Sequence, residues 1–170
     1  MAIVGTRPLT AEDEKLLWEM LQLAIYTPDG SPASPEILQK PEIRRYVEGW
    51  GLPDDRGFAA VVRNTGEPVG AVWTRLLKAD NRGYGYVDDR TPELTIAIHK
   101  DWRDQGVGSF MLRELFDLLR DQYPGVSLSV SPSNPALHLY ERLGFRNVGT
   151  SGTSVTMLRT WEPVADQEKA

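Results

Sequence analysis

The 170-residue chain contains no cysteine and only two histidines. The absence of cysteine excludes disulfides, thiolate metal ligands and a cysteine nucleophile, and two histidines alone cannot build a histidine-rich metal site. No apolar run is long enough to span a bilayer, and the N-terminus lacks the apolar segment of a secretion signal. We therefore expect a cytoplasmic protein with no bound metal and no membrane partner.

Positive charge is also scarce, with 19 Lys and Arg against 24 Asp and Glu and a formal net charge of −5. This balance argues against general affinity for nucleic acid or an anionic membrane, and it favours a cationic or amine substrate. The length and the 41% apolar content suit one domain with a substantial core. Because no repeat or linker is visible, we expect a single domain over residues 1–161 and a polar tail over 162–170.

Apolar spacing and turn residues predict the element order β-α-α-β-β-β-α-β-α-β-β. Strands are expected from residue 2 and over residues 58–63, 68–77, 93–99, 126–130, 145–148 and 154–161. Helices are expected from the cap at Thr10 to about Tyr26, over 41–50, from the glycines at 106 and 108 to about Gln122, and before Gly144. The polar stretch 78–91 is predicted to be a long surface loop, and such loops are often functional.

A candidate anion-binding turn lies between Ile96 and Gly108. The stretch opens with apolar, β-branched residues typical of a buried strand, becomes polar, and then presents Gly106 and Gly108 before a helical pattern. The first turn of a helix has unpaired N–H groups and the positive end of the helix dipole. Glycines there let an anion approach the backbone closely, so the pattern predicts a pyrophosphate site.

Two common phosphate-binding motifs do not fit this turn. The chain has no G-x-x-x-x-G-K-[ST] string, and the dinucleotide motif G-x-G-x-x-G fails because residue 111 is methionine. What remains is Arg103-x-x-Gly106-x-Gly108, a short pattern that an ordinary strand-to-helix turn also explains. It resembles the acyl-CoA-binding signature R/Q-x-x-G-x-G/A of the GCN5-related N-acetyltransferase (GNAT) family.

A second segment, from Asn134 to Phe145, resembles the family's C-terminal cofactor segment, N-x-A-x-x-L-Y-x-[KR]-x-G-F. Read on its own, it is a short helix with Asn134 as a natural cap, Tyr140 six residues later, and Gly144 at the end. A plain capped amphipathic helix explains the same string. Some relatives place the asparagine one residue further from the tyrosine, which would align Ser133 instead.

The resemblance implies an α+β fold with a mixed, mostly antiparallel sheet of about seven strands and four helices, splayed between strands four and five. It implies acetyl-CoA as cosubstrate, with the pantetheine arm between those strands, paired with the backbone of Ile96, Ala97 and Ile98. The pyrophosphate would then be held by the N–H groups of the turn, from Arg103, Asp104, Gln105, Gly106, Val107, Gly108 and Ser109. Asn134 and Tyr140 complete the expected cofactor contacts.

The same resemblance implies direct attack of a primary amine on the thioester in a ternary complex, with Tyr140 as general acid. A phenol with a reference pKa of about 10 stays protonated at neutral pH and can donate to the leaving thiolate. Glu93 is the first candidate for the base, although the family more often places a catalytic glutamate one position earlier, at Pro92. Asp88 and Asp89 follow as candidates, and water can also serve; a surface carboxylate at a strand end explains Glu93 equally well.

The substrate pocket is expected between the first two helices and the 78–91 loop. Its candidate residues, which core packing or solvated surface also explains, are Trp50, Trp73, Tyr84, Tyr86, Asp54, Asp55, Asp88 and Asp89. The acceptor stays open between a small-molecule amine and a peptide or protein amine. A homodimer is expected because exposed final strands often pair in this family. The alternative to an enzyme is a non-catalytic acyl-CoA-binding sensor, and a third reading is a structural protein.

Overall fold

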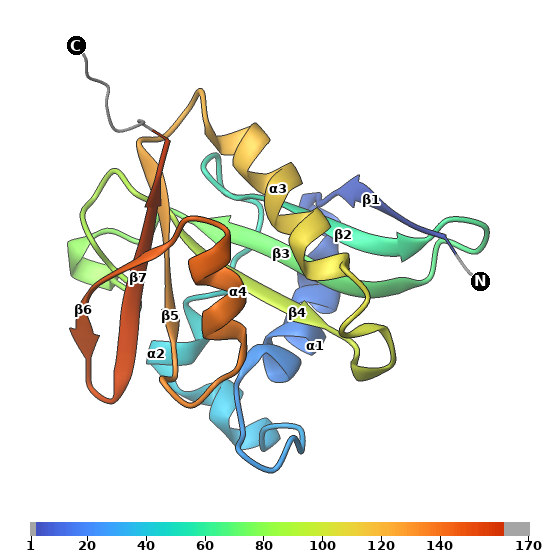
Figure 1. Ribbon diagram of the computed structural model, residues 1–170, viewed down its shortest axis with the longest axis horizontal. Coiled ribbons are helices and arrows are strands. Elements are labelled where there is room, and N and C mark those ends of the chain that lie inside the picture. The colour runs from blue at the N-terminus through green and yellow to red at the C-terminus, as the bar shows by residue number, and fades with distance from the viewer. Residues whose placement is uncertain (1–2, 162–170) are drawn as a thin grey trace. The chain divides into compact units, whose positions relative to one another are not determined.

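The structure is a computed structural model that describes residues 3–161 (Figure 1). Seven strands form one sheet in the order β1-β2-β3-β4-β5-β7-β6. Their bounds are β1 Val4–Pro8, β2 Arg56–Val62, β3 Pro68–Arg75, β4 Glu93–Ile98, β5 Gly125–Val130, β6 Arg146–Ser151 and β7 Ser154–Thr160. Strands β4 and β5 run parallel, whereas β1–β2, β2–β3, β5–β7 and β6–β7 are antiparallel.

Four α-helices accompany the sheet within the described residues: α1 Glu14–Ala24, α2 Pro41–Arg44, α3 Val107–Leu119 and α4 Ala136–Arg142. Short 3-10 turns are η1 Ala11–Asp13, η2 Pro35–Gln39, η3 Ala79–Asn81 and η4 Lys100–Trp102. The predicted fold class and element order are confirmed. The predicted tail over 162–170 lies outside the described residues. None of the helices within 3–161 is long and apolar enough to cross a bilayer.

The described residues fall into two compact units, one formed by 3–75 and 94–115, the other by 76–93 and 116–161. In the first unit β2 pairs with both β1 and β3 (Figure 1), and α1 buries Leu17, Met20 and Leu21. In the second unit β7 lies between β5 and β6 (Figure 1).

The predicted cap of the first helix is confirmed. Thr10 Oγ1 accepts a hydrogen bond from the Glu12 N–H at 3.3 Å, and the Thr10 N–H donates to the Asp13 carboxylate at 2.8 Å. This reciprocal arrangement is a capping box, which satisfies two backbone donors at the start of a helix.

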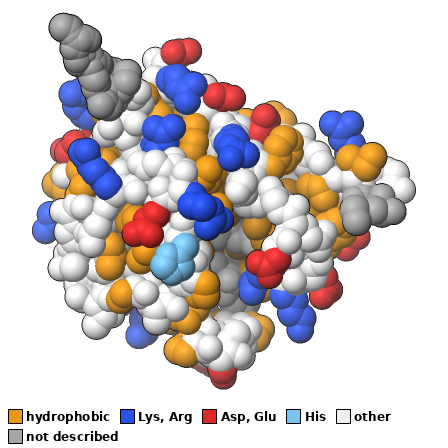
Figure 2. All heavy atoms as spheres, viewed as in Figure 1, with side chains coloured by type: hydrophobic (Ala, Val, Ile, Leu, Met, Phe, Trp, Pro, Cys, Tyr) orange, Lys and Arg blue, Asp and Glu red, His pale blue; other side chains and the backbone are white. Residues whose placement is uncertain are grey.

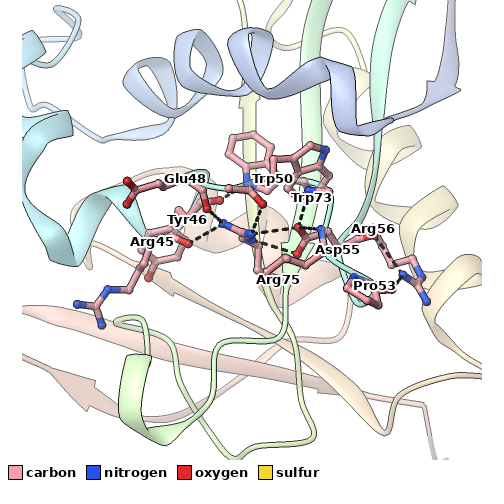
Figure 3. Close-up of polar contacts among 12 residues, drawn as sticks. Arg45, Tyr46, Glu48, Trp50, Pro53, Asp55, Arg56, Trp73 and Arg75 are labelled. Atoms are coloured by element: carbon pink, nitrogen blue, oxygen red, sulfur yellow. Dashed lines mark hydrogen bonds and ion pairs between the residues drawn. The ribbon is translucent and has the colours of Figure 1, made fainter.

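The second helix is much shorter than the predicted 41–50, because α2 ends at Arg44 and turns follow. The carbonyls of Arg45, Glu48 and Gly49 accept hydrogen bonds from the Arg75 guanidinium at 3.2, 2.6 and 3.3 Å (Figure 3). Gly49 also has a φ of +75°, outside the helical region. A side chain on β3 therefore binds the carbonyls of the turns that follow α2.

Arg75 also forms a buried ion pair with Asp55 (Figure 3). The guanidinium Nε lies 3.0 Å from Asp55 Oδ1 and Nη2 lies 3.1 Å from Oδ2, and both side chains are about 95% buried. Asp55 Oδ2 further accepts the N–H groups of Gly51 and Leu52, each at 2.9 Å. The Arg75 guanidinium carbon lies 5.8 Å from the Trp50 ring centroid. This cluster fixes the irregular segment 45–55 against β3.

Strands β4 and β5 are joined at the start of β4. Glu93 lies opposite Ser127, and the Ser127 N–H donates to the Pro92 carbonyl at 2.9 Å. Within the described residues this one pair is the whole register between the two strands.

We expect Arg75→Met to lower the free energy of unfolding by about 3–5 kcal/mol, because Asp55 stays buried without its cation. Urea denaturation measures the loss. The matched control is Arg44→Ala, which breaks the exposed pair with Glu48 and should cost only about 0.2–1 kcal/mol. A loss in Arg75→Met no larger than in the control would show that the buried cluster does not stabilise the first unit.

Candidate functional site

The turn between β4 and α3 has an unusual backbone. Asp104 and Gly106 adopt positive φ values of 60° and 84°. Aspartate tolerates this region better than most residues, and glycine adopts it without steric cost. A Cβ on Gly106 would meet no atom within 4 Å, so the position needs glycine for its φ and not for lack of space.

Unpaired backbone donors begin α3. The first bond of the helix ladder runs from the Phe110 N–H to the Gly106 carbonyl at 3.0 Å. The N–H groups of Val107, Gly108 and Ser109 precede that bond and therefore have no acceptor inside the helix. The neighbouring residues 103–106 are exposed. The turn thus offers an anion both free donors and the positive end of a helix of 13 residues.

Arg103 organises this turn. Its side-chain Nε donates to the Ile98 carbonyl at 3.0 Å, which ties the turn to the end of β4. Gln105 Nε2 similarly donates to the Asp101 carbonyl at 3.0 Å. The arginine of the motif therefore has a structural contact within the first unit.

Tyr140 belongs to the second unit and lies on α4. Its side chain is 8% exposed, and its ring packs edge-on against Phe145 with centroids 5.9 Å apart. Burial raises the pKa of Tyr140 to about 12. The Tyr140 carbonyl accepts the N–H groups of Leu143 and Phe145, and Gly144, with a φ of +96°, ends the helix as predicted.

The start of α4 uses Asn134. Its Oδ1 accepts the Ala136 N–H at 2.9 Å, so the side chain satisfies one of the first donors of the helix. The neighbouring Ser133 has its hydroxyl 3.1 Å from the Ser131 hydroxyl. Asn134 therefore bonds to the first residue of α4, although the N-cap position itself is Pro135, which makes no side-chain cap hydrogen bond. The choice between Asn134 and Ser133 as a cofactor contact remains a prediction.

Glu93 is buried in the second unit. The residue is only 4% exposed, and its Oε2 accepts a hydrogen bond from the Gly85 N–H at 3.0 Å. The alternative of a surface carboxylate at a strand end is therefore wrong. Sequence reasoning missed Gly85, because the only signal was a glycine between two tyrosines in a polar loop.

The predicted substrate residues differ in their environment. Trp50 and Trp73 are core side chains of the first unit, 6% and 0% exposed, whose indole N–H groups donate to the carbonyls of Thr10 and Tyr46 at 3.0 and 2.9 Å. They match the core alternative and offer little or no surface to a substrate. Asp55 is likewise committed to its buried ion pair with Arg75.

The loop residues of the second unit are more accessible. Tyr84 is 40% exposed, and the Tyr86 hydroxyl donates to Asp89 Oδ1 at 2.8 Å. Asp88 is exposed and its Oδ1 accepts the Arg90 N–H at 2.9 Å. Tyr84 and Asp88 are therefore exposed, unlike Trp50 and Trp73, and their role as contacts for an acceptor stays a prediction.

The face shown in Figure 2 carries basic and acidic side chains interspersed with one another. Proteins that bind nucleic acid usually gather Lys and Arg on one face or along one stripe.

Comparison with known proteins identifies a matching family. The sequence profile described as "Acetyltransferase (GNAT) family" matches residues 18–145. Mycothiol acetyltransferase from Acidothermus cellulolyticus is 36% identical over 116 residues, which cover 63% of this chain and 34% of that protein. This chain thus corresponds to about a third of the length of that relative.

Solved structures share the fold. PaiA N-acetyltransferase from Thermoplasma acidophilum, in complex with coenzyme A, gives a TM-score of 0.66 at 16% identity and covers 94% of this chain and 99% of its own. NAA60 from Arabidopsis thaliana, in complex with a bisubstrate analogue, gives a TM-score of 0.61 at 19% identity. The match covers 94% of this chain and 100% of the NAA60 chain. At such identities the likeness establishes the fold alone.

The raised pKa of Tyr140 predicts a pH effect with a definite sign. An unfolded phenol ionises near pH 10, whereas the folded one keeps its proton to about 12, so its contribution to stability is complete below pH 10 and is lost as the pH rises through 12. The phenolate absorbance of the wild type minus that of Tyr140→Phe should show a midpoint near 12. A difference curve with a midpoint near 10 would mean that the ring is solvated.

Proposed function

The chain belongs to the Acetyltransferase (GNAT) family, and on that premise we propose that it transfers an acetyl group from acetyl-CoA to a primary amine. The observation that carries this proposal furthest is the turn between β4 and α3, where two residues of positive φ precede a helix that begins with free N–H groups. The mycothiol acetyltransferase relative and the coenzyme A complex of a structural neighbour support the choice of cosubstrate.

The turn is proposed to bind the pyrophosphate of coenzyme A. The N–H groups between Arg103 and Ser109 and the dipole of α3 both favour an anion there. The backbone of Ile96, Ala97 and Ile98 is proposed to pair with the pantetheine arm. One N–H of that strand would donate to the thioester carbonyl and stabilise the negative charge that develops on its oxygen.

Tyr140 is proposed as the general acid. The nitrogen of the amine forms a bond to the thioester carbon, the carbon–sulfur bond breaks, and the leaving sulfur receives the phenolic proton. The nitrogen loses one proton as it becomes an amide, and this proton restores the phenol. A pKa of about 12 keeps the phenol protonated at neutral pH, so the donor is present in the correct form. The role also explains why a tyrosine with a buried ring, and not a phenylalanine, occupies this position of the motif.

The ammonium of the acceptor must lose a proton before it attacks. Glu93 is the proposed base, acting through water because the carboxylate is buried and already accepts the Gly85 N–H. Asp88, which is exposed on the 78–91 loop, is the second candidate.

The proposed acceptor is a primary amine of a small molecule or of a peptide. The net charge of −5 favours an acceptor that carries positive charge. We further propose a homodimer paired through the exposed β6 strand and a cytoplasmic location.

Release of the coenzyme A thiol in the presence of a panel of amines tests the proposal. We expect Tyr140→Phe to lower kcat about 10²–10⁴-fold, because the leaving thiolate loses its proton donor. The matched control Tyr26→Phe removes a hydroxyl outside the motif and should keep wild-type kcat.

An unchanged kcat in Tyr140→Phe would remove Tyr140 from the mechanism. A wild-type protein that binds acetyl-CoA but releases no thiol above background hydrolysis with any amine would instead be a sensor of acyl-CoA.

A further inference from the structure

One irregular segment of the second unit is hydrogen-bonded to a buried carboxylate. The chain between β3 and β4 contains only the short turn η3, yet its middle is packed onto the sheet. The Gly85 N–H donates to Glu93 Oε2 at 3.0 Å, and Glu93 is the first residue of β4. A hydrogen bond from a neutral donor to a buried carboxylate is stronger than one between neutral groups.

Gly85 is fitted closely to this position. A Cβ there would lie 2.7 Å from the carbonyl carbon of Leu128, 2.9 Å from its oxygen and 2.9 Å from Glu93 Oε2. Backbone atoms cannot move aside as the end of a flexible side chain can. The position therefore requires glycine because the loop backbone lies directly against β5 and the carboxylate.

The sheet beneath the loop is polar. Ser127 lies opposite Glu93, and Thr156 lies opposite Ser129 on the adjacent strand. Thr156 Oγ1 donates to the Tyr84 carbonyl at 3.4 Å, which gives the loop a second, weaker contact with the sheet. Alternation along β5 puts Ser127 and Ser129 on one face, so this face carries hydroxyls and a carboxylate where apolar side chains are usual.

The outer part of the loop is held by its own side chains. Asp89 Oδ1 accepts both the Ala79 N–H and the Tyr86 hydroxyl at 2.8 Å. The Arg82 guanidinium lies 5.4 Å from the Tyr86 ring centroid. Once Gly85 is fixed, the loop presents Tyr84 and Asp88 in a defined arrangement.

We propose that Glu93 is a positioning residue that anchors the 78–91 loop through Gly85, and that the anchored loop is a preformed part of the site for the amine acceptor. The role of the loop in acceptor binding rests on the proposed acetyl transfer. The hydrogen bond that anchors the loop does not depend on that function. Glu93 then has two roles, that of the proposed base and that of the loop anchor. A glutamine can perform only the second, because its side-chain amide oxygen still accepts the Gly85 N–H.

The two roles separate in a pair of variants. Glu93→Gln removes the basic group and keeps the acceptor for Gly85, whereas Glu93→Ala removes both. We expect the acceptor KM to rise about tenfold or more in Glu93→Ala, as loss of one hydrogen bond to a charged group implies, and to stay near the wild-type value in Glu93→Gln. Any fall in kcat that comes from loss of the base should appear in both Glu93 variants.

Two further variants complete the set. Gly85→Ala should raise the acceptor KM as Glu93→Ala does, because its Cβ forces the loop off β5. Ser127→Ala is the matched control, since Ser127 Oγ is buried, lies opposite Glu93 and has no hydrogen-bond partner among the described residues. Removal of the Ser127 hydroxyl should leave the KM for the acceptor and the KM for acetyl-CoA unchanged.

Amide hydrogen exchange of the loop gives a readout independent of activity. Residues 78–91 should exchange faster in Glu93→Ala and Gly85→Ala than in the wild type, Glu93→Gln and Ser127→Ala. Equal KM and exchange in the two Glu93 variants, or a Gly85→Ala variant that behaves as wild type, would overturn the anchor. Faster loop exchange in a protein that acetylates no amine would support the anchor and reject the proposed function.

Discussion

The proposed function of this chain depends on the backbone N–H groups that begin α3, which have no acceptor inside that helix. A helix cannot satisfy its own first donors, and in most proteins a side-chain cap or water does so. Here Asp104 and Gly106 turn the chain through positive φ, and α3 then begins with its N–H groups beside exposed residues. An anion is the natural partner for such a turn. The proposed use of acetyl-CoA depends first on this backbone geometry and only then on particular side chains.

Two buried carboxylates perform a related task in the two units. In the first unit Asp55 and Arg75 bind the backbone of the segment that follows α2, and in the second unit Glu93 binds the backbone of the loop before β4. Each places a charged group where desolvation is costly, and each offsets that cost with hydrogen bonds to main-chain groups. The result in both cases is an irregular segment whose backbone is hydrogen-bonded to a buried side chain.

The order of elements could be predicted from the sequence because each helix and strand has a strong local signal, such as the capping box at Thr10 or the alternation in β5. The glycine turn and the Tyr140 motif were also visible, since their residues are close together in the chain. The end of α2 at Arg44 was not predicted, and the segment that follows it makes its hydrogen bonds to Arg75, about 30 residues away in the chain. The burial of Trp73, Asp55 and Glu93 likewise follows from distant partners, and a local pattern does not distinguish such residues from surface ones.

Amide hydrogen exchange with and without coenzyme A tests the central claim most directly, because it reports on the backbone N–H groups themselves. Saturating coenzyme A should slow exchange at residues 96–98 and 103–109, and pantetheine, which lacks the pyrophosphate, should slow it only at 96–98. Binding of coenzyme A without protection at 103–109, or no binding at all, would contradict the account.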